Sequence, residues 1–315
     1  MKENVFFQMK GLGLGDTISS IPLANLHNTE KNKNVFLMSN FSDLFSGYDN
    51  IVFIKEYQMY MDNDRVLIDH NNQIFNMNDM YILGYHTTHH KFIDNKSYFQ
   101  IRKNERLPLQ RQFAKFLDID FKKEIKPNIH IDPNYKSPYE KYICIATQTT
   151  MQGKYWNYPN GWEVVIEYLK KIGYTVLCID KHSSYGLIYN NNIPKNAIDK
   201  TNLSLKEAAN LINNCDFFIG LDSGLSWLAW ALNKEVVQIL GLTGGAIAFE
   251  NKYRVINEKV CNTCFSDRNI KQFDSDMPFN DFLLCPKYKN TNKIFECTKS
   301  ITPEEVIKKI NILIS

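Results

Sequence analysis

The sequence predicts an α/β protein built from two Rossmann-like, doubly wound domains that face a cleft. Short apolar runs alternate with amphipathic helical patterns along the whole chain, and this alternation restarts clearly near residue 142. A segment with three prolines, residues 124–141, separates the two series. Strands that are apolar throughout are typical of parallel sheets covered on both faces. We therefore place the N-terminal domain at residues 1–135 and the C-terminal domain at residues 136–315.

In the N-terminal half, the first strand is expected at residues 4–9 and the first helix at residues 16–27. Further apolar runs predict four more strands, at 34–39, 50–56, 65–69 and 80–85. An amphipathic run at 109–119 predicts a helix. This half is rich in asparagine, which blurs the element boundaries.

In the C-terminal half, the pattern is sharper. Strands are expected at 142–147, 174–180, 216–222 and 235–241, with helices at 160–171, 204–215, 223–232 and 302–315. Ser204 and Glu207 have the spacing of a capping box, and Thr302 followed by Pro303 marks the start of the last helix.

The composition is that of a globular protein, with 44 % hydrophobic residues in a chain of 315. A net charge of +3 is too small an excess to indicate nucleic-acid binding. We find no signal-peptide pattern and no apolar run long enough to span a bilayer. We therefore expect a cytoplasmic protein, in which clustered thiols are metal ligands or catalytic groups rather than disulfides.

Four of the seven cysteines fall within residues 259–298. Cys261 and Cys264 form a C-x2-C pair, and Cys285 and Cys297 follow further along the chain. This spacing predicts a four-thiolate metal finger that holds iron or zinc, and its closed shell indicates a structural metal. The alternative is four unrelated thiols in a loop. The other three cysteines are expected to be small buried apolar side chains: Cys144, Cys178 and Cys215.

The first strand ends in the glycine-rich stretch "KGLGLGDTISSIP", which places Asp16 at the start of a helix. Glycine lets the backbone turn sharply and approach a ligand, so we include Gly13 and Gly15, with Gly11, in a candidate binding turn. Open α/β sheets carry their sites at the carboxyl ends of strands. Asp16 is therefore a candidate reactive carboxylate, with a simple helix N-cap as the alternative.

Two further strand ends in the second half carry polar groups. "GLDSG" places Asp222, Ser223 and Gly224 at a helix start, where free N–H groups and the helix dipole suit a diphosphate; Asp222 as a helix cap is the alternative. The nearby Trp227 and Trp230 are expected to be core.

"ATQTTMQGK" places Thr147, Gln148 and Thr149 at another strand end, with Lys154 in the following loop. A lysine there can neutralise a phosphate, although a solvated loop lysine is the alternative. Together these groups suit transfer from a nucleotide-diphospho compound. Asp16 would deprotonate an incoming hydroxyl, and Lys154 with the helix dipole would stabilise the leaving diphosphate.

These motifs resemble those of the GT-B glycosyltransferases that add heptose to lipopolysaccharide. The matches are the "GD…P" turn at Gly15, Asp16 and Pro22, the lysine after a threonine-rich strand end, and the "DSG" helix start with Ala229. The resemblance is closer to the bacterial autotransporter heptosyltransferases, through "TQTTMQGKYWNYPNGW", "GLDSGLSWLAWAL", "YRVINEKVCNTC", "LLCPKY" and "FECTKSITP".

That resemblance implies a GT-B fold with an N-terminal acceptor-side domain and a C-terminal nucleotide-sugar-binding domain. It implies inverting transfer from ADP-heptose to serine or threonine hydroxyls of a protein. It also implies Asp16 as general base, Lys154 on the donor phosphates, iron held by the four cysteines, and a large homo-oligomer.

Rival interpretations are a related transferase that uses another nucleotide sugar on a glycan acceptor, a same-fold epimerase, and a non-catalytic metal-finger protein that binds a partner. Sugar choice is expected to depend on loops such as residues 241–250. Asp180 and His182 are candidate nucleoside contacts, with an ordinary surface loop as the alternative.

Overall fold

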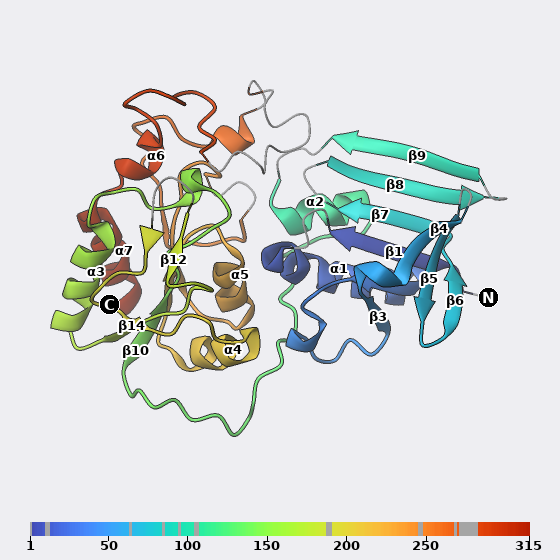
Figure 1. Ribbon diagram of the computed structural model, residues 1–315, viewed down its shortest axis with the longest axis horizontal. Helices are drawn as coiled ribbons and strands as arrows, with labels where there is room; N and C mark the ends of the chain where they lie inside the picture. The colour runs from blue at the N-terminus through green and yellow to red at the C-terminus, as the bar shows by residue number, and fades with distance from the viewer. Residues whose placement is uncertain are drawn as a thin grey trace. The chain divides into compact units, whose positions relative to one another are not determined.

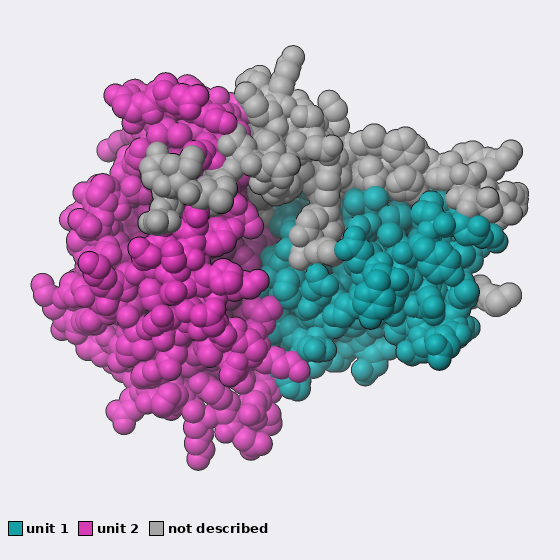
Figure 2. Space-filling model, in the orientation of Figure 1, with its two compact units in different colours: residues 1–130 teal, residues 131–315 magenta. Residues whose placement is uncertain are grey.

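The computed structural model describes residues 2–9, 13–62, 65–83, 86–93, 96–103, 107–186, 191–244, 248–267, 270 and 283–315. The chain forms two compact units, residues 1–130 and residues 131–315 (Figure 2). The division falls inside the proline-containing segment at 124–141. Each unit has its own sheet and its own core, and each is described by itself below.

Unit 1 is built on a mixed sheet of order β3-β2-β1-β7-β8-β9 (Figure 1). Its strands are β1 (Asn4–Met9), β2 (Asn34–Met38), β3 (Ile51–Ile54), β7 (Asp79–Leu83), β8 (His86–Ile93) and β9 (Lys96–Lys103). The first four are parallel, as expected for a Rossmann-like half, but β8 and β9 are antiparallel additions. The strand expected at residues 4–9 is confirmed with the same bounds.

The two faces of this sheet are covered differently. Helices α1 (Leu14–Lys31) and α2 (Leu109–Phe116) pack on one face. An antiparallel sheet of β4 (Met59–Asp62), β5 (Arg65–His70) and β6 (Gln73–Asn76) packs on the other. The prediction of a doubly wound first domain is therefore only partly right, because a small sheet takes the place of the second helix layer.

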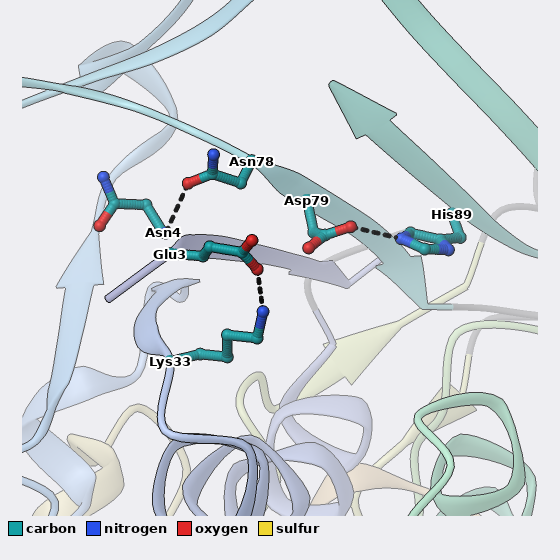
Figure 3. Close-up of polar contacts among 6 residues, drawn as sticks. All are labelled: Glu3, Asn4, Lys33, Asn78, Asp79 and His89. Carbon is teal, nitrogen blue, oxygen red and sulfur yellow. Dashed lines mark hydrogen bonds and ion pairs between the residues drawn. The ribbon is translucent and has the colours of Figure 1, made fainter. Parts of the chain in front are cut away.

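Local polar contacts close the amino-terminal end of the unit 1 sheet. Figure 3 shows three of them: Asn4 N–H donating to Asn78 Oδ1 (2.8 Å), Asp79 Oδ1 beside His89 Nε2 (2.8 Å), and the ion pair of Lys33 with Glu3. Asp79 is almost fully buried, and His89 stacks on Tyr81. These contacts lie at the opposite end of β1 from the glycine-rich stretch, so they hold the sheet rather than the candidate site.

Unit 2 contains a fully parallel sheet of order β14-β11-β10-β15-β16-β17. Its strands are β10 (Tyr142–Ile145), β11 (Thr175–Cys178), β14 (Ile198–Asp199), β15 (Phe218–Gly220), β16 (Val236–Ile239) and β17 (Arg254–Val255). The chain starts in the middle of this sheet, runs to one edge and then returns to build the other edge, which is the doubly wound order. The ligand site of such a sheet lies where the direction reverses, between β10 and β15.

Helices cover both faces of the unit 2 sheet (Figure 1). α3 (Gly161–Lys171) and α7 (Pro303–Ile314) pack on one face, while α4 (Leu205–Asn214) and α5 (Gly224–Ala231) contact the strands from the other. The remaining elements are short: η1 (Ser42–Leu44) and η2 (Glu56–Gln58) in unit 1, and β12 (Ser184–Tyr185), β13 (Asn191–Asn192), η3 (Gln152–Lys154), η4 (Cys264–Ser266) and α6 (Glu296–Lys299) in unit 2.

Helix signals in unit 2 are confirmed in detail. Ser204 and Glu207 form the expected capping box of α4, and Thr302 forms one with Glu305 at the start of α7. Cys144, Cys178 and Cys215 are buried as expected. In the described part of the chain, no helix has both the length and the apolar character needed to cross a membrane.

Candidate functional site

The carboxyl ends of β10, β11 and β15 gather polar side chains in unit 2. Residues 147–149 follow β10, Asp180 follows β11, and Asp222 follows β15. Because β10 pairs in parallel with both β11 and β15, these three exits lie side by side at one edge of the sheet. The sheet topology therefore brings together the second-half site residues that the sequence predicts.

Lys154 and Asp222 form the charged pair of this edge. Lys154 Nζ lies 3.7 Å from Asp222 Oδ2 and donates a hydrogen bond to the Asp222 carbonyl oxygen at 3.3 Å. Both side chains are largely buried, at 18 % and 6 % exposure. Lys154 is therefore not the solvated loop lysine of the alternative reading, because Asp222 orients its ammonium group at the strand exits.

The helix that follows Asp222 begins without a side-chain cap. Ser223 is the N-cap residue of α5, but its hydroxyl makes no capping hydrogen bond, and Asp222 lies one residue earlier. Within the described residues, the buried atoms Ser223 Oγ and Asp222 Oδ2 have no hydrogen-bond partner. Uncapped first-turn N–H groups and the Ser223 hydroxyl can donate hydrogen bonds to an anionic ligand such as a phosphate, and Lys154 offsets the charge of Asp222. Trp227 and Trp230 are buried, as expected of core residues.

The loop after β10 is held by its own hydrogen bonds. The Thr147 hydroxyl donates to Asp180 Oδ2 at 2.7 Å, and the Thr149 hydroxyl donates to the Met151 carbonyl at 2.9 Å. Gln148 Nε2 donates to the His182 carbonyl at 2.7 Å. These bonds fix the direction of the loop that leads to Lys154; a direct contact between these side chains and a donor stays a prediction.

Asp180 is only 2 % exposed, and both of its carboxylate oxygens accept hydrogen bonds from the β10 loop. It is therefore neither a residue of a surface loop nor a side chain presented to a nucleoside, which were the two sequence interpretations. The sequence signal was present, since Asp180 ends an apolar strand run. What the pattern could not show is that its partners come from the neighbouring strand.

In unit 1, Asp16 is the third residue of α1 rather than its N-cap. Gly13 is the N-cap, with φ −71° and ψ 149°, and Gly15 lies inside the helix. Neither of these two glycines has a positive φ, and Gly11 lies outside the described residues, so the glycine-rich binding turn stays a prediction. A Cβ on Gly13 would approach Asp16 Oδ2 to 2.6 Å. Glycine at this position leaves room for the Asp16 carboxylate.

The four predicted metal ligands gather beside the loop after β16. Thr263, between the first two cysteines, donates its N–H to the Gly241 carbonyl at 3.0 Å. A Cβ on Gly241 would approach Cys297 Sγ to 3.0 Å. Burial, together with the neighbouring cysteines, raises the pKa of the Cys264 thiol and of the Cys297 thiol to about 12.

The predicted metal finger is not confirmed as a formed site. Among the residues that the structure describes, no group of three or more His, Cys, Asp or Glu side chains is arranged to hold a metal ion. Most of the connection between Cys264 and Cys285, residues 268–269 and 271–282, lies outside the described residues. The thiols are therefore neighbours without coordination geometry.

The cysteine-bearing segments contact the turn that carries Lys154. Asn157 Nδ2 donates to Thr298 Oγ1 at 2.8 Å, and Trp156 Nε1 donates to the Ile301 carbonyl at 2.9 Å. A Cβ on Gly153 would lie 3.1 Å from the Leu284 carbonyl oxygen. Residues 284–301 therefore pack against one side of the turn at residues 152–154 that carries Lys154.

Comparison with known proteins identifies the family. The sequence profile of Glycosyltransferase family 9 (heptosyltransferase) matches residues 54–272, more than half of the chain. The chain belongs to this family. Its parallel unit 2 sheet and the polar edge at β10 and β15 are therefore those of a family 9 glycosyltransferase.

Two curated relatives are autotransporter heptosyltransferases. The chain is 47 % identical over 169 residues to the autotransporter heptosyltransferase BAHTCr of Citrobacter rodentium, a match covering 53 % of this chain and 40 % of that protein. It is 47 % identical over 176 residues to the autotransporter heptosyltransferase TibC of Escherichia coli, covering 55 % of this chain and 42 % of TibC. These matches span less than half the length of each curated relative.

The TibC structure solved in complex with ADP-D-β-D-heptose has a TM-score of 0.81 to this chain. It is 32 % identical over 99 % of this chain and 77 % of that chain. TibC is described as an iron-containing, dodecameric glycosyltransferase. A further relative, 29 % identical over 201 residues (64 % of this chain and 46 % of that protein), is the inactive autotransporter heptosyltransferase BimC of Burkholderia thailandensis. Family membership therefore does not by itself establish activity.

Proposed function

We propose that this chain is an inverting glycosyltransferase that transfers a sugar, heptose from ADP-heptose, to serine or threonine hydroxyls of an autotransporter-type protein. The observation that carries the proposal is the Lys154–Asp222 pair beside the uncapped start of α5. A buried cation and free helix N–H groups at one sheet edge favour a diphosphate. The solved complex of TibC with ADP-D-β-D-heptose supports this choice of donor.

In the proposed reaction, the acceptor oxygen attacks the anomeric carbon while the bond from that carbon to the diphosphate oxygen breaks. The acceptor proton passes to the Asp16 carboxylate, and ADP leaves with the bonding electron pair. Lys154 and the start of α5 stabilise the charge that develops on the diphosphate. A single displacement of this kind inverts the anomeric centre.

The four cysteines suit a structural metal, and we propose that Cys261, Cys264, Cys285 and Cys297 hold iron, with zinc as the chemical alternative. The support is chemical: thiolates are the usual ligands of iron or zinc in structural sites, and three of these four cysteines are buried. Thiols with raised pKa values are protonated at neutral pH, so metal binding there must release protons. The metal would supply folding free energy and no reaction step.

The metal assignment has a direct test. Cys264→Ala should lose the metal measured by elemental analysis and should lower the melting temperature more than Cys215→Ala, a buried cysteine outside the cluster. Equal metal content in both variants would contradict the assignment. We further propose homo-oligomeric assembly, because TibC is dodecameric. We also propose a cytoplasmic location, where reducing conditions keep the four thiols available for a metal.

The donor is tested on the purified full chain with ADP-heptose, another ADP-sugar, a UDP-sugar and a GDP-sugar. Released nucleotide is measured with and without an autotransporter passenger, and the passenger is analysed by mass spectrometry. Acceptor-dependent ADP release together with passenger glycosylation supports the proposal. Transfer from a different nucleotide sugar, or to a glycan, keeps the enzyme class and overturns the heptose or protein-acceptor assignment.

A second candidate is a non-catalytic protein that binds a partner, which the inactive relative BimC favours. That candidate predicts no nucleotide release from any donor. It also predicts that the Asp16→Asn variant binds the autotransporter partner as tightly as the parent does.

A further inference from the structure

Asp180 is a buried carboxylate that the proposed reaction does not use. It follows β11 and is 2 % exposed, and no ion pair with it is found among the described residues. Burying a carboxylate costs several kcal/mol unless hydrogen bonds or a cation compensate. The partners that compensate this charge therefore identify its role.

Those partners are donors, and nearly all come from one loop. Thr147 donates both its backbone N–H (2.8 Å) and its hydroxyl (2.7 Å) to Asp180 Oδ2. Gln148 donates its backbone N–H to Asp180 Oδ1 at 3.2 Å. The fourth donor is Cys178 Sγ, 3.3 Å from Oδ2 on the same strand exit as Asp180. One carboxylate thus holds two consecutive backbone amides of the β10 exit.

Strand pairing makes this arrangement rigid. β10 and β11 are parallel with Ile145 opposite Cys178, so Asp180 stands directly beside Thr147. The main chain then continues from Thr147 through the turn at residues 152–154 to Lys154. A change in the direction of the exit at Thr147 would propagate to the lysine.

We propose that Asp180 is a positioning residue that fixes the Thr147–Gln148 exit in the shape that binds the donor diphosphate. The inference rests on the proposed function, because it assigns this exit to donor binding. At 2 % exposure the carboxylate does not reach substrate itself. It acts through the loop, so its loss should raise the KM for the donor and leave kcat at saturating donor nearly unchanged.

The test compares Asp180→Asn with Asp199→Asn in the full chain. Asp199 is a matched control, because its exposed carboxylate accepts the Thr201 backbone N–H at 2.8 Å in the same unit. Calorimetric titration with ADP should show affinity weakened by about tenfold in Asp180→Asn, as expected for losing charge-assisted hydrogen bonds, and unchanged affinity in Asp199→Asn. Equal ADP affinity in Asp180→Asn and the parent would overturn the proposal.

Thr147→Val is the second variant, since it removes one hydroxyl bond and keeps the backbone bond. If the hydroxyl acts only through Asp180, the effects of Thr147→Val and Asp180→Asn on ADP affinity will not add. Additive effects would contradict the proposed route. Thr147→Ser keeps the hydroxyl and should restore the affinity. If Asp180→Asn fails to fold, the proposal is tested by comparing the ADP affinity of Thr147→Val with that of Thr147→Ser.

Amide hydrogen exchange separates this inference from the proposed function. The Thr147 and Gln148 amides should exchange faster in Asp180→Asn than in Asp199→Asn, whether or not ADP binds. If the parent binds no ADP, the proposed function fails, and faster exchange confined to these two amides still supports the positioning role. Unchanged exchange overturns it.

Discussion

The two units differ in how deeply they bury the polar side chains that follow a central strand. In unit 2, Asp180, Thr147 and Asp222 are nearly buried and tied into the strand exits. In unit 1, Asp16 lies half-buried in the first turn of α1, three residues after the N-cap glycine, Gly13. Side chains that hold a diphosphate-binding loop in place act from buried positions, whereas a general base must remain accessible to an acceptor. The difference suggests binding in unit 2 and proton transfer in unit 1.

The variant with the largest expected effect tests the assignment of proton transfer to Asp16 in unit 1. Asp16→Asn removes the base and keeps a side chain of the same shape over Gly13, so transfer should fall by about 10²- to 10⁴-fold. Asp43→Asn, an exposed aspartate in the first turn of η1, is the control and should be silent. The measurement is initial-rate sugar transfer at saturating donor. A rate within a factor of about two of the parent would remove the general-base role.

The second prediction concerns acid stability, which should differ between the units. His27 is buried in unit 1 against the rings of Phe7 and Tyr81, and burial lowers its pKa from 6.5 to about 4. The unfolded chain binds a proton at His27 more tightly than the folded chain does. The free energy of unfolding is therefore highest above pH 6.5 and decreases as the pH falls toward 4. The loss amounts to about 3 kcal/mol.

His27→Leu should flatten the dependence of unit 1 stability on pH in this window, while His182→Gln, at an exposed position in unit 2, should leave it unchanged. Denaturant unfolding followed between pH 7 and pH 4 checks this. A parent protein whose stability does not change over that range would show that His27 is not held neutral in the fold.

The third prediction sharpens the unit 2 side of the comparison. Lys154→Met keeps most of the buried side-chain volume and removes the charge, leaving Asp222 without its cation. The expected cost to donor binding is about 2 kcal/mol, the size of a lost charge-assisted hydrogen bond. Lys252→Met is the control, since Lys252 is 71 % exposed and pairs at 3.9 Å with Glu235. Unchanged KM for the donor in Lys154→Met would exclude the lysine from the donor site.

The variant with the smallest expected effect tests the packing of residues 284–301 against the turn that carries Lys154. In Gly153→Ala, the added Cβ would lie 3.1 Å from the Leu284 carbonyl oxygen and 3.6 Å from a Phe295 ring carbon. The backbone must shift to relieve the first contact, at a cost of about 1 kcal/mol in unfolding free energy. Thermal melting and the KM for the donor should both change slightly. If neither changes, the segment around Leu284 does not support the turn.

Unit 2 was far easier to predict from sequence than unit 1, and particular residues explain why. Apolar strands and the capping boxes at Ser204 and Thr302 are local signals, and each is confirmed. In unit 1, Asn71 and Asn72 both adopt positive φ in the two-residue turn between β5 and β6. The sequence predicted one strand in this region, at 65–69, whereas the structure has the three-stranded antiparallel sheet of β4, β5 and β6 joined by such a turn.

The candidate site shows the same limit. Motif position placed Asp222 at one strand exit and Lys154 in the loop after another, because strand ends can be found from local pattern. The role of Asp180 could not be found in this way, since its partners in the β10 loop are 32 and 33 residues away and depend on how β10 and β11 pair. The cysteine spacing predicted that the four thiols lie near one another. Whether they coordinate a metal depends on the fold of the connection between Cys264 and Cys285, which local sequence pattern does not specify.

One titration tests the division between units most directly: ADP binding by calorimetry to the parent, Asp16→Asn and Lys154→Met. ADP carries the diphosphate and lacks both the sugar and the acceptor, so it reports on donor binding alone. We predict equal affinity in the parent and Asp16→Asn, with weaker binding in Lys154→Met. Equal weakening in both variants, or undiminished binding in Lys154→Met, would contradict the assignment of donor binding to unit 2.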